Sequence, residues 1–300
     1  MKRSITLIVF AVLGGTFIFG EDARLPAVKT GRSTTSFGIS FLPQMWDDGG
    51  DKEDIPKAHV ITAGERIEYS FTGCLSGVFD WFPGENVLSS TEDSKSPAAN
   101  GSHDPALGVR FQIIGLNAPV KQERFRLTVA PQVIFPFPSI NLPFWKVGMD
   151  DKRGNNAWGF GGGVSFDTDL TKQFFLNFHG EFFSYPIENE AKVKHGWGAA
   201  FEIEPHFETH FTGGTGLRIG LPVRFAFAPE KKINGLGNGL DSYFLSASPM
   251  AAVYFDNIIP ARFSGGEPSP LELSLQYSLP VLGKNTAALH AVTLGITTFF

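Results

Sequence analysis

The chain ends on the stretch "HAVTLGITTFF", residues 290–300, in which the residue type alternates up to the last position. The larger, mostly apolar set consists of Val292, Leu294, Ile296, Thr298 and Phe300. The intervening set consists mainly of small residues, Ala291, Thr293, Gly295 and Thr297, and ends at Phe299. A period of two places the two sets on opposite faces of a β-strand. The end of the chain is therefore predicted to be a strand with one apolar face and one face of small residues.

The same alternation recurs along the chain, with turn residues between the segments. In the segment 216–228, for example, Leu217 and Ile219 alternate with Arg218 and Gly220. The predicted strands are 34–42, 67–81, 106–116, 124–135, 157–167, 173–185, 196–211, 216–228, 242–255, 271–279 and 290–300. Beyond the first residues, no apolar run approaches the roughly 18 residues that a membrane helix needs. Any insertion into a membrane must therefore use strands.

The polar face of these segments distinguishes a membrane barrel from a soluble one. In a soluble barrel the apolar face points inward, and the solvated face is rich in Lys and Glu. Here the polar face is mostly Gly, Ser, Thr, Ala and Gln with a few Arg and Glu, while Lys is confined to the connections. This composition favours a narrow polar lumen and a Phe-rich face toward lipid. The predicted fold class is all-β, a transmembrane antiparallel up-and-down β-barrel.

An aromatic last residue preceded by alternating apolar residues resembles the C-terminal signature of bacterial outer-membrane β-barrel proteins, which their assembly machinery recognises. The matching positions are Phe300, Ile296, Leu294 and Val292, whereas Thr298 is more polar than is usual at its position. The resemblance covers the mature chain as an architecture and identifies no single functional family. It implies that both termini are periplasmic and that the number of strands is even.

An even count requires one more strand than the eleven segments provide. A short strand near 57–63, followed by a tight turn at 64–66, supplies it and gives about 12 strands, with 10 to 14 left open. The short periplasmic connections are then 64–66, 117–122, 168–172, 212–215 and 256–268. The longer outer connections are 43–57, 82–105, 136–156, 186–195, 229–241 and 282–287. Bulges are expected where proline falls within a predicted strand, at Pro131, Pro205, Pro222 and Pro249.

The beginning of the chain has the layout of a secretory signal peptide, because a basic stretch precedes a short apolar run at 5–13. Residues 1–20 are predicted to be this signal and residues 21–300 to form one barrel domain; an uncleaved anchor helix is the alternative. The net charge of −5 argues against a nucleic-acid partner. The single cysteine, Cys74, allows no intrachain disulfide and is expected to face the interior from a strand.

Charged residues on the polar faces form the candidate site. The predicted lumen-lining residues are Glu202, Glu204, His206, Glu208, His210, Arg218, Arg224, Arg124, Arg126 and Glu68. The short turn 212–215 allows two registers, which place Arg224 opposite either Glu202 or Glu204. Either register sets arginines across from carboxylates and imidazoles. No metal site is predicted, because successive ligands on one strand face lie about 7 Å apart. No cofactor is predicted.

These features predict a narrow pore in the cell outer membrane for the diffusion of small solutes. The alternative is a surface-exposed structural or adhesive barrel, whose long acidic loops bind external partners; the acidic stretch "DDGGDKED" lies in the loop 43–57. No enzymatic activity is predicted, since no serine lies at a short spacing from a strand histidine on the same face. An outer-membrane lipid hydrolase is the enzymatic alternative, because twelve-stranded outer-membrane barrels of similar length include a phospholipase and a lipid A deacylase. The expected partners are outer-membrane lipids, the barrel assembly machinery and small solutes, and the oligomeric state is left open.

Overall fold

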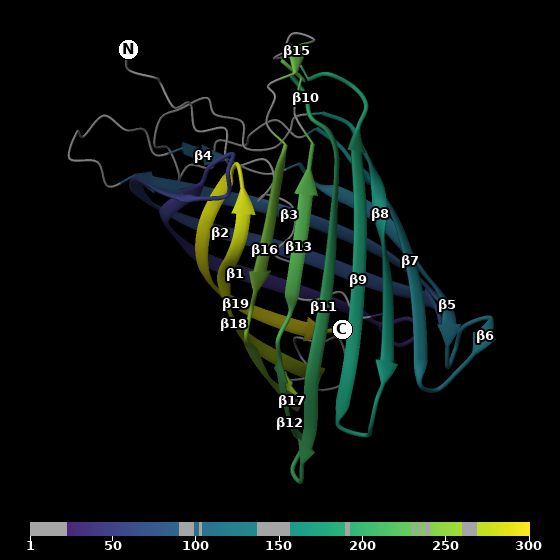
Figure 1. The fold of residues 1–300 in the computed structure, drawn as a ribbon. Coiled ribbons are helices and arrows are strands. Elements are labelled where there is room, and N and C mark those ends of the chain that lie inside the picture. Colours follow the sequence, from purple (N-terminus) through teal and green to yellow (C-terminus); the bar gives the residue numbers. More distant parts are fainter. Residues whose placement is uncertain are drawn as a thin grey trace, which may run out of the picture.

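The computed structural model describes residues 23–89, 99–101, 104–136, 157–189, 193–229, 232–233, 236–237, 241–259 and 269–300. These residues form a closed antiparallel barrel of 12 strands and contain no helix (Figure 1). The predicted fold class and the predicted strand number are both confirmed. Within the same residues, no helix is long and apolar enough to span a membrane.

The wall of the barrel is a meander in which each strand pairs with its neighbours along the chain. Its strands are β1 (Gly31–Trp46), β2 (Lys52–Thr72), β3 (Leu75–Ser89), β5 (Ala106–Gly115), β7 (Phe125–Ile134), β8 (Gly159–Asp169), β9 (Phe174–Tyr185), β11 (Gly196–Phe211), the pair β12 (Thr215–Gly220) and β13 (Val223–Ala228), the pair β16 (Ser242–Ala247) and β17 (Met250–Ile259), β18 (Ser269–Lys284) and β19 (Thr286–Phe299). The members of each pair are two halves of one crossing of the wall.

Five shorter strands among the described residues lie outside the 12 crossings, near the two ends of the barrel. They are β4 (Ala99–Gly101), β6 (Val120–Lys121), β10 (Val193–Lys194), β14 (Lys232–Ile233) and β15 (Leu236–Gly237). The last three form a small separate sheet, and Figure 1 shows β10 and β15 at the end opposite the turns that join β8 to β9 and β11 to β12.

The barrel closes because β19 pairs with β18 on one side and with β1 on the other. At the seam the backbone N–H of Gly31 donates to the carbonyl of Phe300 (2.6 Å), and the N–H of Phe300 donates to the carbonyl of Gly31 (3.0 Å). The Phe300 ring packs over Gly31, where an added Cβ would lie 2.5 Å from the ring and would displace it. We call the end of the barrel that holds Gly31 and Phe300 the terminal end.

The two faces of the wall divide as the alternation predicted. Leu294 and Phe300 point outward with 43% and 50% of their surface exposed, while Ala291 and Thr293 are buried inside. The outward face carries large apolar side chains on every side, including Phe37, Phe71, Phe111, Phe160, Phe182, Phe201, Ile219, Leu275 and Leu294. The buried interior is rich in polar groups, including Ser40, Glu68, Arg110, Thr128, Asp167 and Glu204. This is the reverse of a soluble barrel and matches a wall that faces lipid.

The predicted turn at 64–66 is wrong. Strand β2 runs through it, and the chain reverses at Gly73 and Cys74 instead. The real turn escaped the sequence pattern because it leaves the alternation in phase: Ile67 faces Phe79 across the hairpin, so the apolar positions keep the same parity on both arms. Cys74 consequently lies in a turn. The prediction that it faces the interior from a strand is therefore wrong.

Two predicted outer loops are much shorter than expected. The loop 43–57 shrinks to 47–51, because β1 continues to Trp46 and β2 starts at Lys52. The predicted connection 282–287 shrinks to a turn at Asn285, which has a φ of 49°. A hydrogen bond from Asn285, together with Lys284, lowers the pKa of Asp48 and ties the two turns together. Much of the predicted connections 82–105, 136–156 and 256–268 lies outside the described residues.

Prolines interrupt strands without shifting their register, so the bulges predicted at these positions are wrong. Pro131 and Pro205 lie within continuous ladders, and Pro222 and Pro249 separate the two halves of one crossing. Each missing N–H costs a ladder bond, but three of the carbonyls still accept one. These bonds join Leu221 to Pro205, Ser248 to Pro222 and Tyr277 to Pro249. Pro205, Pro222 and Pro249 therefore lie on a line across consecutive crossings.

A closed ladder predicts resistance to detergent. The native protein should migrate faster on SDS gels than the boiled protein, because the ladder of hydrogen bonds continues around the closed wall and the barrel opens only on heating. The measurement is mobility against temperature, with circular dichroism as a check on strand content. Identical mobility before and after boiling would contradict the closed wall.

The seam predicts that the last residue has two separable roles. Deleting Phe300 removes both backbone bonds to Gly31 and the aromatic ring, whereas Phe300→Ala removes only the ring. If the assembly machinery recognises the ring, both variants should accumulate in the periplasm and be degraded, while Phe300→Tyr inserts normally. Fractionation of outer membranes measures this. Normal insertion of Phe300→Ala would show that only the ladder matters.

Candidate functional site in the barrel lumen

The stripe predicted on β11 does line the lumen. Glu204 and His206 are buried, and Glu202 and Glu208 share their face, whereas His210 is exposed at the end of the strand. The β11 hairpin adopts one of the two expected registers. Arg224 lies directly opposite Glu202, and Arg218 lies directly opposite Glu208.

An ionic cluster forms around the buried side chain of Glu68, which points inward from β2. Both carboxylate oxygens accept hydrogen bonds of 2.9 Å from Nη1 of Arg110 on β5. On the other side, Arg32 of β1 approaches to 2.8 Å, and Ser76 of β3 donates at 2.5 Å. Glu68 and Arg110 are both 0% exposed. Removing one partner of such a buried pair lowers the free energy of unfolding by roughly 3–5 kcal/mol. This cluster therefore holds the strands around it in position.

The chain that precedes β1 lies across the lumen. We call residues 23–30 the strap. At its far end, the Ala23 N–H donates to Oδ2 of Asp167 on β8 (2.7 Å), and the Ala23 carbonyl accepts from Gln112 on β5 and Thr128 on β7, both at 2.7 Å. At its near end, the Lys29 N–H donates to the Ser70 carbonyl on β2. The strap therefore joins the β1–β2 wall to the β5–β8 wall near the terminal end.

Arg24 fixes the middle of the strap to β11. Its guanidinium lies 3.6 Å from Oε2 of Glu208 and 5.1 Å from the centre of the Phe175 ring, which it faces. Phe175 in turn stacks on His206, with the ring centres 5.2 Å apart and the planes at 13°. Nε2 of His206 is 3.2 Å from Glu208. The predicted lumen residues Glu208 and His206 thus hold the strap as well as lining the lumen.

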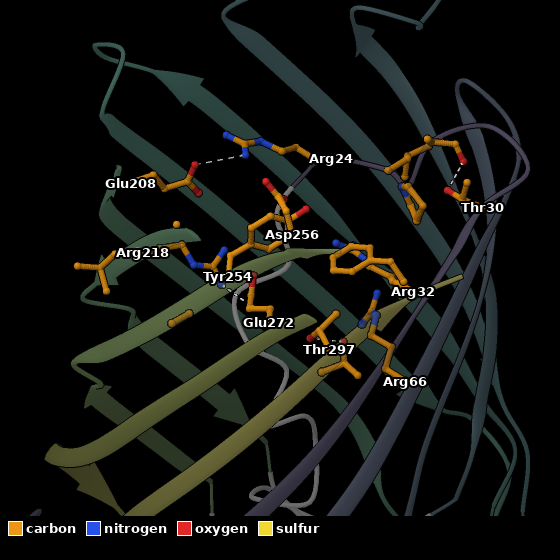
Figure 2. A pocket seen from close by; sticks show the side chains of 18 of the residues that line it. Arg24, Thr30, Arg32, Arg66, Glu208, Arg218, Tyr254, Asp256, Glu272 and Thr297 are labelled. Carbon is orange, nitrogen blue, oxygen red and sulfur yellow. Dashed lines mark hydrogen bonds and ion pairs between the residues drawn. The ribbon is translucent and has the colours of Figure 1, made fainter. Parts of the chain in front are cut away.

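Beside the strap lies a cavity of about 650 Å³. Its walls come from the strap and from β1, β2, β3, β11, β12, β17, β18 and β19, and Figure 2 shows many of the side chains that line it. Arg32 and Arg66 lie on one side, and Glu208, Arg218 and Glu272 on the other. Arg218 and Glu272 approach to 3.6 Å. The cavity is therefore lined by charges of both signs.

A second lumen cluster contains a serine next to a histidine. Oγ of Ser165 on β8 lies 2.9 Å from Nδ1 of His179 on β9, and Nε2 of His179 lies 3.9 Å from Glu181, which is ion-paired with Arg224. No local pattern in the sequence indicated this pair, because its members face each other from neighbouring strands. Ser165 is only 1% exposed, so a substrate cannot reach its hydroxyl in this arrangement.

Two predicted arginines lie at the margin of the lumen. Arg124 lies in the exposed turn before β7, so its prediction as a lumen residue is wrong. Arg126 makes a two-pronged ion pair with Asp169, at 2.8 and 3.0 Å. The strand pattern did not predict the roles of Arg110, Arg32 and the strap.

The physical reason for these omissions differs between residues. Arg110 is a lone charge in a strand whose partner lies 42 residues away in the chain, and no local pattern connects the two. The strap is held at Ala23 through backbone atoms, which every residue type except proline provides. The one available signal in the sequence was that Arg110 is an isolated arginine at an inward-facing position of a predicted strand, which indicates a buried partner for its charge. Among the described residues, no group of three or more His, Cys, Asp or Glu side chains could hold a metal ion.

Sequence comparisons find neither a matching family nor a matching curated protein. Comparison of structures finds the COG4313 outer membrane channel from Pseudomonas putida F1, with a TM-score of 0.73 at 14% identity, over 94% of this chain and 100% of that chain. The β-domain of the Bordetella autotransporter BrkA aligns with a TM-score of 0.46 at 8% identity, over 90% and 99% of the two chains. The first likeness concerns the fold alone, and the second is too low to support an argument. The chain has the fold of the bacterial outer-membrane β-barrel proteins.

Proposed function

We propose that this protein is an outer-membrane pore for the diffusion of small solutes. The observation that carries the proposal is the polar interior of the barrel. It contains a cavity of about 650 Å³ lined by ionised side chains, while the outer surface of the wall is apolar. Charged groups that line an internal passage are the means by which pores select among solutes. Export through the signal at 1–20 and insertion by the assembly machinery belong to the same proposal.

The structure bears on the two alternatives in different ways. The adhesive alternative relied on long acidic loops, and the most acidic of these, 43–57, proves to be a short hairpin at 47–51 tied to the next turn. A lipid hydrolase would need a nucleophile that its substrate can reach. Ser165 faces the lumen and is buried, so it offers no such nucleophile to a lipid outside the wall. The pore is therefore the function that the geometry supports best.

The strap narrows the proposed passage. It crosses the lumen near the terminal end, and it is held at Ala23 by buried hydrogen bonds. A solute must therefore pass beside the strap, through the space that includes the cavity, unless the strap moves. A narrow, partly obstructed pore predicts a small conductance for the unaltered protein.

Weakening the anchors of Ala23 should free the strap. Gln112→Leu combined with Thr128→Val removes two hydrogen bonds worth about 0.5–1.5 kcal/mol each. Trypsin should then cleave after Lys29 roughly tenfold faster in the folded barrel, and the conductance in planar bilayers should rise. The matched control is Gln132→Leu, which makes the same glutamine-to-leucine change as Gln112→Leu at another inward-facing position, on β7. Unchanged cleavage and conductance in the double variant would show that the strap does not restrict the passage.

The charges on β11 should set the ion preference of the pore. Replacing Glu202, Glu204 and Glu208 together by Gln leaves the facing arginines in excess and should shift the reversal potential toward anion selectivity. Glu208 borders the cavity with 19% of its side chain exposed, whereas Glu204 is almost fully buried. Glu208→Gln alone should therefore reproduce most of the shift, and Glu204→Gln alone should produce little. A conducting triple variant with an unmoved reversal potential would show that this stripe does not line the ion path.

A further inference from the structure

We propose that the cavity binds small dipolar solutes, molecules that carry one anionic and one cationic group and no net charge. This inference rests on the proposed pore and names the class of solute that its cavity selects. It comes from the order of charges along one side of the cavity. Four side chains, Arg24, Glu208, Arg218 and Glu272, form a row in which the sign of the charge alternates. We call them the alternating row.

The alternating row is set by strand pairing. Arg24 of the strap lies 3.6 Å from Glu208 of β11, and Arg218 of β12 lies 3.6 Å from Glu272 of β18. Glu208 and Arg218 are directly opposite each other on neighbouring strands, which joins the two pairs into one row. Figure 2 shows all four side chains directed into the same cavity.

These ion pairs are open in a way that the Glu68 cluster is not. A charge-assisted hydrogen bond is about 2.7–2.9 Å long, and the contacts of Glu68 with Arg110 and Arg32 fall in that range. The two contacts in the alternating row are both 3.6 Å, with 37% and 19% of the side chains exposed in one pair and 19% and 24% in the other. A solute can therefore reach these charges, whereas it cannot reach the pair of Glu68 and Arg110, both of which are 0% exposed.

The pattern of signs favours a dipolar solute over a simple ion. An anion drawn toward Arg24 and Arg218 also approaches Glu208 and Glu272, so attraction and repulsion largely offset each other. A solute with a carboxylate and an ammonium group can place each charge against the opposite one. An apolar solute would instead have to displace water from charged groups without replacing their hydrogen bonds, which is unfavourable. The volume of about 650 Å³ lies within the usual range of small-molecule sites.

Solute entry into proteoliposomes, measured by swelling, tests the proposal. Glutamine is the dipolar probe and xylitol the uncharged probe, while glutamate and lysine carry the same dipole as glutamine with a net charge of −1 or +1. Glutamine should enter roughly threefold faster than xylitol, as expected for an exposed pairing of charges. Replacing one pair without changing the net charge, by Arg218→Gln with Glu272→Gln, should abolish this preference, so that glutamine and xylitol enter this variant at similar rates. The matched control is Arg126→Gln with Asp169→Asn, which removes an ion pair that does not line the cavity.

The outcomes distinguish a failure of the dipolar site from a failure of the proposed pore. Entry of all solutes with no advantage for glutamine, or faster entry of glutamate or lysine, would overturn the dipolar site and leave the pore standing. Entry of no solute would overturn both. Loss of the preference in the control variant as well would show that the preference does not depend specifically on the alternating row, and this result would also overturn the site.

A second measurement does not depend on the folding of any variant. Glutamine at millimolar concentration should reversibly lower the ion current of the unaltered protein in planar bilayers, because an occupied cavity obstructs the passage. Xylitol at the same concentration should lower the current less. Equal effects of the two solutes would overturn the site.

Discussion

The pairing of the last strand with the first is the interaction on which the rest of this structure depends. A sheet in contact with lipid cannot leave an edge, because no water is present to satisfy its N–H and carbonyl groups. Strand β19 removes the edge by pairing with β1, and the ladder continues to the reciprocal bonds of Gly31 and Phe300. The two phenylalanines at the end of the chain are explained by this closure. Phe299 turns toward the cavity, and Phe300 turns outward and completes the seam.

Closure also determines where charge can be placed. Once one face of every strand is committed to an apolar environment, all ionised groups within the wall must lie on the other face, where they crowd one another in a narrow space. They are therefore either fully satisfied, as Glu68 is by Arg110 and Arg32, or left beside water, as Arg218 and Glu272 are at the cavity. The first arrangement holds the strands in register. The second leaves charge that a solute can reach, which makes the cavity the functional part of the lumen.

Period-two alternation predicted the features that depend on neighbours along one strand. It identified the faces of β19 and the lumen stripe on β11, and it gave eleven of the 12 crossings; the even number implied by the resemblance supplied the last one. It failed where the deciding contact is between strands or where the pattern stays in phase. The turn at Gly73 was hidden because Ile67 and Phe79 share a parity as well as a face. The Ser165–His179 pair and the Glu68–Arg110 pair depend on strands meeting across a ladder or a lumen, which local spacing does not reveal.

The strap shows how a segment without any alternation can shape the site. Its anchoring at Ala23 uses backbone atoms. The one charged side chain that it places in the cavity is Arg24, which faces Phe175 and approaches Glu208. Arg24 thus belongs both to the strap and to the row of charges that borders the cavity. Without it the accessible row would consist of Glu208, Arg218 and Glu272, which still alternate in sign but carry a net negative charge. The position of the strap therefore determines both the width of the passage and the balance of charge within it.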